Sequence, residues 1–249
     1  MRSSLSMPFA ALVAISAFAI TARADERARF ALDLSGARCG LVRAHMEGDD
    51  TLRIGAQEIA PSLVAVVDTF AQGKPVKRDL RLTSGAVVKR AEGARLVSVK
   101  LPAIGSGGAP DVELAFSAPK VTTSPLLSAK EAPPPPASER IASFHVELTG
   151  MQAIDAPKLD AITLKQKPDS SVTTGDIAFE VAAGGAPQFV AWKKTAKSAP
   201  KTLRIEYLGA QSTTILKLSL DRCTPSSVEP LGASGTTRIT LACAALRVQ

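Results

Sequence analysis

The amino-acid sequence predicts a mainly β protein made of two tandem antiparallel domains, each a β-barrel or β-sandwich with one helix, related by duplication. Two observations support this prediction. Segments in which apolar and polar residues alternate, as in a strand with one buried face, recur in the same order in both halves of the chain. Between the halves, the four prolines at 133–136 favour an extended spacer and cannot pair in a sheet. We expect domains at 25–128 and 141–249, with a proline-rich linker at 129–140.

The first 24 residues are expected to form a secretory signal peptide. Arg2 precedes an apolar run at 7–20, and residues 22–24 form an A-x-A arrangement suited to signal peptidase. The run is shorter than the roughly 20 apolar residues that a membrane-spanning helix needs. We therefore expect a mature chain from Asp25 that is secreted or periplasmic and has no transmembrane segment after cleavage.

Each half is expected to open with a strand that alternates apolar and polar residues and ends at a glycine, Gly36 or Gly150. The apolar positions are Phe30, Leu32 and Leu34, and Phe144, Val146 and Leu148. A short strand is expected next at 51–54, and we match it to 163–166 in the second half.

A helix should follow in each half, because the apolar spacing changes from two residues to three or four. Pro61 opens the first helix and Gly73 can close it, whereas Pro187 opens the second. The apolar faces consist of Leu63, Val66, Val67 and Phe70, and of Phe189, Trp192 and Ala196. The single tryptophan is therefore expected in the core.

A hairpin and a last strand complete each half. The hairpins begin at 78–82 and 201–205, and their second arms reach Pro102 and Pro225, where proline is expected to end the ladder. The last strands alternate Val112, Leu114 and Phe116, and Ile239, Leu241 and Cys243. Small loop insertions account for the differences in spacing, so we infer duplication rather than chance reuse of one strand.

Charge and cysteine content limit the function. Removal of Arg2 and Arg23 leaves 28 basic against 23 acidic residues without a dense basic block, and only 4% of residues are aromatic, so no nucleic-acid partner is expected. In an oxidising compartment the three cysteines can form at most one intramolecular disulfide. Cys243 lies in phase with a buried strand face and is expected to pack as a small apolar residue. If a bridge forms, Cys223 with Cys243 is favoured, because both lie in one predicted domain.

No catalytic, cofactor-binding or metal-binding residue is predicted, and hence no enzyme and no cofactor. His45 and His145 have no Cys, His or carboxylate partner at ligand spacing, so both are expected at the solvated surface. The glycine-rich segment 105–110 joins two strands and should be a hairpin turn. Residues 184–187 precede a helix but lack the lysine of a phosphate site, and the carboxylates at 49–50 lack calcium-loop spacing.

Several segments together resemble one protein family. The second half reads "FHVELTG" from Phe144, "AITLKQ" from Ala161, "PQFVAWKK" from Pro187, "KTLRIEYL" from Lys201 and "RITLACAAL" from Arg238. The first half reads "FALDLSG", "TLRIG" and "PSLVAVVDTFAQGKPVKRDLRL". This order resembles the tail-tube proteins of contractile phages and the related secreted ring protein of type VI secretion. The resemblance covers nearly the whole mature chain and implies a tail-tube-like β domain in each half.

The sequence departs from that family in three ways. Thr224 stands where the family has a tryptophan before proline, and Cys243 and Ala244 replace a histidine and a glutamate. Only 12 residues separate Gly150 from Thr163, so the long hairpin that stacks one ring on the next in the family is predicted to have shrunk. The chain also carries an export signal. We therefore expect no extended tube; a ring of three chains and a monomeric two-domain module both fit the sequence.

The leading function expected is an exported, non-enzymatic structural or assembly protein that acts through protein partners or self-association. The alternative is a periplasmic or secreted binding module for a glycan, a lipid or another small ligand held between the domains. An enzyme ranks third, because few residues could converge in a catalytic site.

Overall fold

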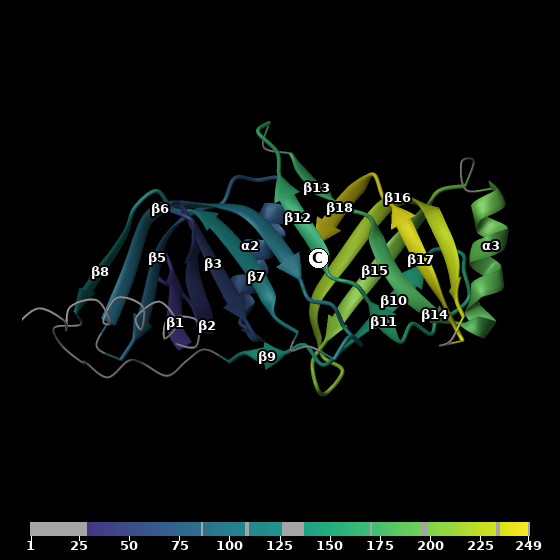
Figure 1. The fold of residues 1–249 in the computed structure, drawn as a ribbon, viewed down its shortest axis with the longest axis horizontal. Coiled ribbons are helices and arrows are strands. Elements are labelled where there is room, and N and C mark those ends of the chain that lie inside the picture. Colours follow the sequence, from purple (N-terminus) through teal and green to yellow (C-terminus); the bar gives the residue numbers. More distant parts are fainter. Residues whose placement is uncertain are drawn as a thin grey trace, which may run out of the picture.

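The computed structural model describes residues 29–85, 87–107, 110–125, 137–169, 171–195, 199–232 and 235–248. The described chain is mainly β, with two α-helices (Figure 1). The elements of its first half are β1 (Arg29–Leu34), β2 (Ala37–Glu47), β3 (Thr51–Ala56), β4 (Glu58–Ile59), α2 (Pro61–Ala71), β5 (Lys77–Ser84), β6 (Val87–Leu101), β7 (Val112–Ser117) and β8 (Val121–Pro125).

The second half has a longer series of strands before its helix. Its elements are β9 (Glu139–Arg140), β10 (Ser143–Leu148), β11 (Lys158–Leu159), β12 (Ile162–Gln166), β13 (Val172–Thr174), β14 (Ile177–Ala182), the 3-10 helix η1 (Ala183–Gly185), α3 (Ala186–Thr195), β15 (Lys201–Leu208), β16 (Thr214–Leu231), β17 (Thr236–Ala242) and β18 (Ala245–Val248). In Figure 1 the two halves lie side by side along the longest axis of the molecule.

Six strands of the first half close into an antiparallel barrel. The strand order is β1-β2-β3-β7-β6-β5, and β5 returns to pair with β1. Ser35 and Gly36 form the β1–β2 turn with φ of 53° and 88°, as a two-residue hairpin of the type I′ kind requires. The predicted inward residues of β1, Phe30, Leu32 and Leu34, are each 2% exposed, which confirms the alternation.

Helix α2 follows the sequence prediction closely. Pro61 is its first residue, and its buried side chains include Leu63, Val66, Val67 and Phe70. At its end the N–H of Gly73, with φ of 75°, donates to Phe70, and the N–H of Lys74 donates to Thr69. These two bonds satisfy carbonyls that the end of a helix leaves without partners. The helix lies near β2 and near β18 of the second half, between the two halves (Figure 1).

The second half forms a seven-stranded antiparallel sheet in the order β10-β15-β16-β17-β14-β11, with β18 added on β16. Its helix, α3, lies at the outer end of the molecule (Figure 1). Phe189 and Trp192 are buried as predicted, and the Trp192 indole N–H donates to the Ala199 carbonyl at 2.9 Å. The predicted third apolar position, Ala196, lies outside the described residues.

The two halves share most of their strand pairings. In the first half, β5 pairs with β1 and β6, and β7 pairs with β3 and β6. In the second half, β15 pairs with β10 and β16, and β17 pairs with β14 and β16. The strand after β7 folds back onto β6, as the strand after β17 folds back onto β16. A helix follows β3 in one half and β14 in the other.

These pairings correct one match made from the sequence. Segment 163–166 belongs to β12, and β12 pairs with β6 of the first half and with β13. The counterpart of 51–54 by position and pairing is β14, which precedes the helix and pairs with β17 as β3 pairs with β7. The segment between the first strand and this counterpart in the second half is therefore 149–176, longer than the 12 residues between Gly150 and Thr163.

A second correction concerns Pro225. This proline was expected to end the ladder, yet β16 continues to Leu231, and Pro225 pairs with Leu241 on β17. Proline fits here because only one edge of the strand is paired at this point. Pro102, by contrast, directly follows the end of β6 as expected.

Of the predicted linker at 129–140, the structure describes only the last four residues, 137–140. Residues 129–136 lie outside the described chain, and Glu139 and Arg140 form the short strand β9, which pairs with Glu58 and Ile59 of β4. In the described residues, no helix is long and apolar enough to cross a membrane.

Candidate functional site

The most extensive contact between the two halves is a joint, formed by adding β12 to the side of β6 that β5 leaves unpaired. Residues Ile162 to Lys165 pair with Leu101 to Ser98, antiparallel. Ile162 and Leu164 point inward and are 2% and 0% exposed, whereas Lys165 is exposed. The alternating sequence of β12 therefore continues the core of the first barrel while keeping its polar side in water.

Side chains hold the end of this added strand in place. The Arg95 guanidinium on β6 donates from Nε and Nη2 to the Gln166 side-chain oxygen at 3.2 and 3.0 Å. β13 then pairs with the outer edge of β12, from Leu164 to Gln166. As a result, the edge of the first sheet ends in a strand of only three residues, a length that offers little backbone for further pairing.

Two further contacts tie the halves together. Ile104, after β6, and Leu159 exchange both backbone hydrogen bonds, at 2.8 and 3.0 Å. Glu58 on β4 accepts from the Ser138 hydroxyl at 2.9 Å and pairs with the Arg140 guanidinium at 3.3 Å. The buried apolar residues of both halves form one continuous cluster. The joint is therefore a structural interface and not a loose tether.

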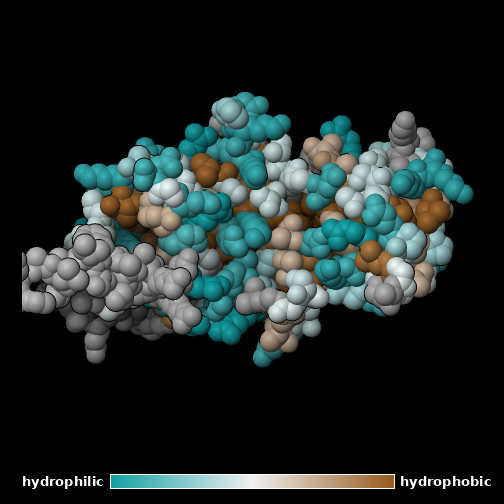
Figure 2. Space-filling view, viewed as in Figure 1, coloured by the Kyte–Doolittle hydropathy of each residue, from teal (hydrophilic) through white to brown (hydrophobic). Residues whose placement is uncertain are grey.

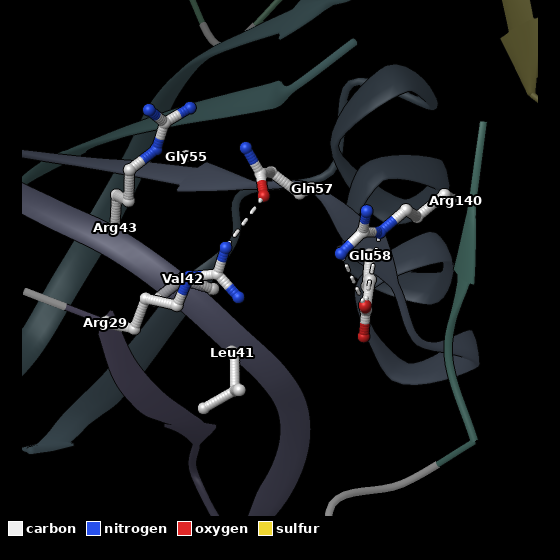
Figure 3. A pocket seen from close by; sticks show the side chains of 8 residues that line it. All are labelled: Arg29, Leu41, Val42, Arg43, Gly55, Gln57, Glu58 and Arg140. Atoms are coloured by element: carbon white, nitrogen blue, oxygen red, sulfur yellow. Dashed lines mark hydrogen bonds and ion pairs between the residues drawn. The ribbon is translucent and has the colours of Figure 1, made fainter. Parts of the chain in front are cut away.

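A small cavity lies beside this interface (Figure 3). Three guanidiniums line it, and in the figure Arg29 points to the Gln57 amide oxygen, at 3.5 Å, while Arg140 points to Glu58. Arg43 points away from them and pairs with Asp111. The cavity holds about 20 Å³, room for about one water molecule and far below the size of a small-molecule site.

Asp111 is the most constrained acid near this cavity. One carboxylate oxygen binds Arg43, and the other is buried without a hydrogen-bond partner in the described chain. The carboxylate lies over Gly55, where a Cβ would be 3.6 Å from it. Arg43 thus holds one oxygen of the carboxylate, whereas the other bears the cost of a buried polar atom without a partner in the described chain.

A larger, open groove of about 320 Å³ lies on the outside of the first barrel. Arg81 and Arg90, directly opposite each other on β5 and β6, line it together with Asp33, Asp79 and Glu92. Like charges in opposite positions on neighbouring strands repel each other. This groove is the only one of the two described pockets with room for a small polar ligand.

Charged residues form a ladder across the outer face of the second sheet. Lys158 donates to Glu180 at 2.8 Å, and Arg238 pairs with Asp160. The hydrogen bond from Lys158 holds the pKa of Glu180 below its usual value, with a further contribution from Thr236. The same bond raises the pKa of Lys158. Alternating charges of this kind fix the register of neighbouring strands.

In the described part of the chain, the two histidines do not converge with other groups that could serve in catalysis. His45 lies on β2 opposite Arg53, and His145 lies on β10 opposite Glu206; both histidines are exposed. Within the described ranges, no group of three His, Cys, Asp or Glu side chains could hold a metal ion. The described part of 105–110 connects β6 to β7, and 184–187 runs from η1 into α3.

Two of the three cysteines are joined. Cys223 and Cys243 form a disulfide with an S–S distance of 2.04 Å, which links β16 to the end of β17. Cys39 is a free, buried thiol, and burial raises its pKa. Ser62 on α2 donates to the Cys39 sulfur at 3.4 Å, so this thiol is packed against the helix.

Sequence reasoning missed the residues that build the joint. Arg95 and Gln166 carry no motif, and their contact depends on a pairing between distant strands. A usable signal was present at 177–182, where "IAFEVA" alternates apolar positions just before the second helix. This alternation predicts a strand at 177–182 directly before the helix, and it leaves 162–174 as a separate hairpin between the first strand and that strand.

Hydrophobic residues on the surface are dispersed. Four large apolar side chains of the described residues are exposed. They lie on β2 (Leu41 and Met46), on β6 (Val87) and on α3 (Val190). On the face shown in Figure 2, hydrophobic residues are interspersed with hydrophilic ones. That face therefore presents no single broad apolar patch.

Comparison with known proteins gave no assignment: no protein-family model matches this sequence, and no curated protein matches it.

Proposed function

We propose that the chain is an exported, non-enzymatic structural or assembly protein composed of two tail-tube-like units related by duplication, and that it acts through protein–protein contacts. The proposal combines the export signal and family resemblance of the sequence with the shared strand pairings of the two halves. In both halves, the first strand pairs with the strand after the helix, and the strand before the helix pairs with the strand that follows the long hairpin, whereas β2, between β1 and β3, has no counterpart that pairs with β10.

The observation that carries this proposal is the joint. One unit supplies a hairpin, β12–β13, and the other supplies the edge of β6, so the units associate by strand addition. Strand addition is a general mode of protein recognition, in which backbone hydrogen bonds give affinity and alternate side chains give specificity. A unit that uses its strand edges for association in this way is suited to assembly.

The position of the hairpin also bears on the resemblance. It lies between the first strand, β10, and the strand before the helix, β14, which is where the family has the hairpin that stacks rings. Here the hairpin is occupied within the chain, because it pairs with the first unit. We therefore favour a self-contained tandem that contacts other proteins over an extended tube.

Recovery of the exported protein from its own cells tests the proposal. The tagged mature chain should co-purify with one partner in a fixed ratio, and the complex should form again from the two purified proteins. Recovery of the protein alone from every fraction, together with turnover in a broad substrate screen, would contradict the proposal.

A specific observation keeps the binding-module alternative open. The open groove on the first barrel is large enough for a small polar ligand and brings two guanidiniums together. If this groove binds a ligand, a thermal-shift screen of sugars and small acids should give a hit that Arg81→Ala abolishes. Lys193→Ala, which removes an exposed cation on α3, is the control. Absence of any hit would leave the groove without a ligand role.

A further inference from the structure

The disulfide lies where β16 changes its partner strand. On one side, β16 pairs with β18 along 218–221 and with β17 from Thr224 onwards. Arg222 and Cys223 lie between these two ladders, and the sulfur of Cys223 is bonded to that of Cys243. Cys243 directly follows β17 and lies two residues before β18. The disulfide therefore joins β16 to the corner at which the chain passes from β17 to β18.

The first half has the same corner without a disulfide. Its long strand, β6, pairs first with β8 and then, from Arg95 onwards, with β7. In both halves the second of these ladders opens with two pairs and then shifts register. In this common register Ala94 and Ala118 occupy the positions of Cys223 and Cys243, and both alanines are buried. The same pair of positions is therefore crosslinked in only one half.

A backbone contact holds the corner of the first half. The N–H of Ala118 donates to the carbonyl of Asp50, in the turn between β2 and β3, at 2.6 Å. In the second half the counterpart of β3 is β14, whose ladder with β17 ends at Ile177 and Leu241, two residues before Cys243. The hairpin that precedes β14 pairs with β6 of the first half instead. The disulfide thus takes the place of the contact that the β2–β3 turn makes in the first half.

This corner determines where the C-terminal strand lies. β18 pairs with β16 through four consecutive residues, and it lies near α2 of the first half and near β13. In Figure 1, β18 lies between the two halves. Short segments at the end of a chain open locally unless another contact ties them down. The disulfide supplies such a contact directly before β18.

The two cysteines differ in their access to a reductant. Cys223 is fully buried, whereas Cys243 is partly exposed. A thiolate of a dithiol reductant therefore attacks the Cys243 sulfur, and the bond to Cys223 breaks as Cys223 leaves as a thiolate and takes up a proton. The second thiol of the reductant then displaces Cys243. Two electrons and two protons pass to the protein, which gains two thiols, and the reductant becomes a disulfide.

We propose that the Cys223–Cys243 disulfide is a redox-sensitive latch for the C-terminal strand. In the oxidised protein the latch holds β18 on β16 and beside α2. Reduction by a dithiol releases β18 and changes the surface between the two halves, while the rest of the second sheet stays folded. This inference does not rest on the proposed function, and the search for a protein partner does not test it.

Hydrogen exchange of the purified protein with and without dithiothreitol tests the proposal. Amides at 245–248 should exchange at least tenfold faster in the reduced protein, whereas the β10–β15 ladder should stay protected. β8, which follows the corner at Ala118, is the internal control, and its exchange should not change. Unchanged exchange at 245–248 after complete reduction would overturn the proposal. Equal loss of protection at 245–248 and in the β10–β15 ladder would also overturn it.

Two variants separate the disulfide from other effects of the reductant. The double variant Cys223→Ala, Cys243→Ala should exchange rapidly at 245–248 without dithiothreitol and should not respond to it. Cys39→Ala removes the free thiol and keeps the disulfide, so it should respond as the wild type does. A folded double variant that keeps slow exchange at 245–248 would show that β18 needs no latch.

Discussion

Gly105 shows how a single backbone position supports the contact between the halves. Its φ is 82°, and a Cβ at this position would collide with the Pro157 carbonyl and lie 3.1 Å from the Lys158 Cα. The neighbouring residue, Ile104, makes the backbone bridge to Leu159. Both the conformation and the close approach therefore require glycine.

We predict that Gly105→Ala lowers the free energy of unfolding by about 2–4 kcal/mol, because the collision adds to the cost of a left-handed alanine. Gly107→Ala is the matched control, since Gly107 has a similar φ of 79° and no atom within 4 Å of its Cβ position. Gly107→Ala should lower the free energy of unfolding by about 1–2 kcal/mol, which is the cost of a left-handed alanine without any collision. Urea denaturation measures both, and equal losses would show that the approach to Pro157 is not tight.

Tyr207 has a buried hydroxyl that makes no hydrogen bond within the described chain. The side chain is fully buried on β15, and its hydroxyl has no hydrogen-bond partner in the described chain. Burial raises the pKa of the phenol, so it stays neutral. We predict that Tyr207→Phe is neutral or stabilises the protein by up to about 2 kcal/mol, because an unpaired polar group leaves the core. A loss of more than about 1 kcal/mol in thermal or urea unfolding would indicate a bridging water.

The charge ladder on the second sheet gives stability a dependence on pH. Because the folded protein holds the pKa of Glu180 below its unfolded value, the ion pair contributes stability above the unfolded value. That contribution is lost as the pH falls through the folded pKa. We therefore expect stability to decline below about pH 4.5, and to decline less in Glu180→Gln. Glu147→Gln, an exposed acid 3.7 Å from Arg204, is the control and should leave the wild-type curve unchanged.

The disulfide links two strands at the end of the second sheet. Cys223 and Cys243 are 20 residues apart, and a crosslink over a loop of this length is worth about 3 kcal/mol by restricting the unfolded chain. Replacement of both cysteines by alanine should lower stability by about that amount. The wild type with reductant should lose stability similarly. If calorimetry shows no change on reduction, the bridge is absent in the purified protein.

Sequence patterns predicted the elements whose burial is local and periodic. The β1 alternation and α2, with Pro61 at its start and Gly73 at its end, depend only on neighbouring residues, and both were found as expected. The assignment of 163–166 was wrong because β12 and a strand inside a barrel have the same alternation. Which neighbour a strand pairs with is decided by long-range packing, here against β6, and no local pattern encodes it.

The continuation of β16 past Pro225 shows the same limit. Proline signals a break in a central strand, but β16 is an edge strand beyond Cys223, and there proline is tolerated. The joint between the two halves could not be predicted from the sequence for a related reason. Arg95, Gln166 and Glu58 are ordinary polar residues whose role arises only when two halves of the chain are placed together.

At the scale of the whole molecule, the joint makes the two halves one structure. β12, which lies beyond the four prolines at 133–136, extends the sheet of the first half, and α2 lies near both sheets. A continuous buried cluster extends through both. The central structural claim about the molecule is that the pairing of β12 with β6 holds the two halves together.

Hydrogen exchange of the purified protein tests that claim most directly. Amides at 98–101 and 162–165 should be protected in the wild type, and Leu164→Asp should expose both segments together while the β10–β15 ladder stays protected, because a buried charge expels β12. Lys165→Asp, an exposed change on the same strand, should leave the protection intact. Rapid exchange of 162–165 in the wild type, or loss of protection in only one of the two segments, would contradict the account.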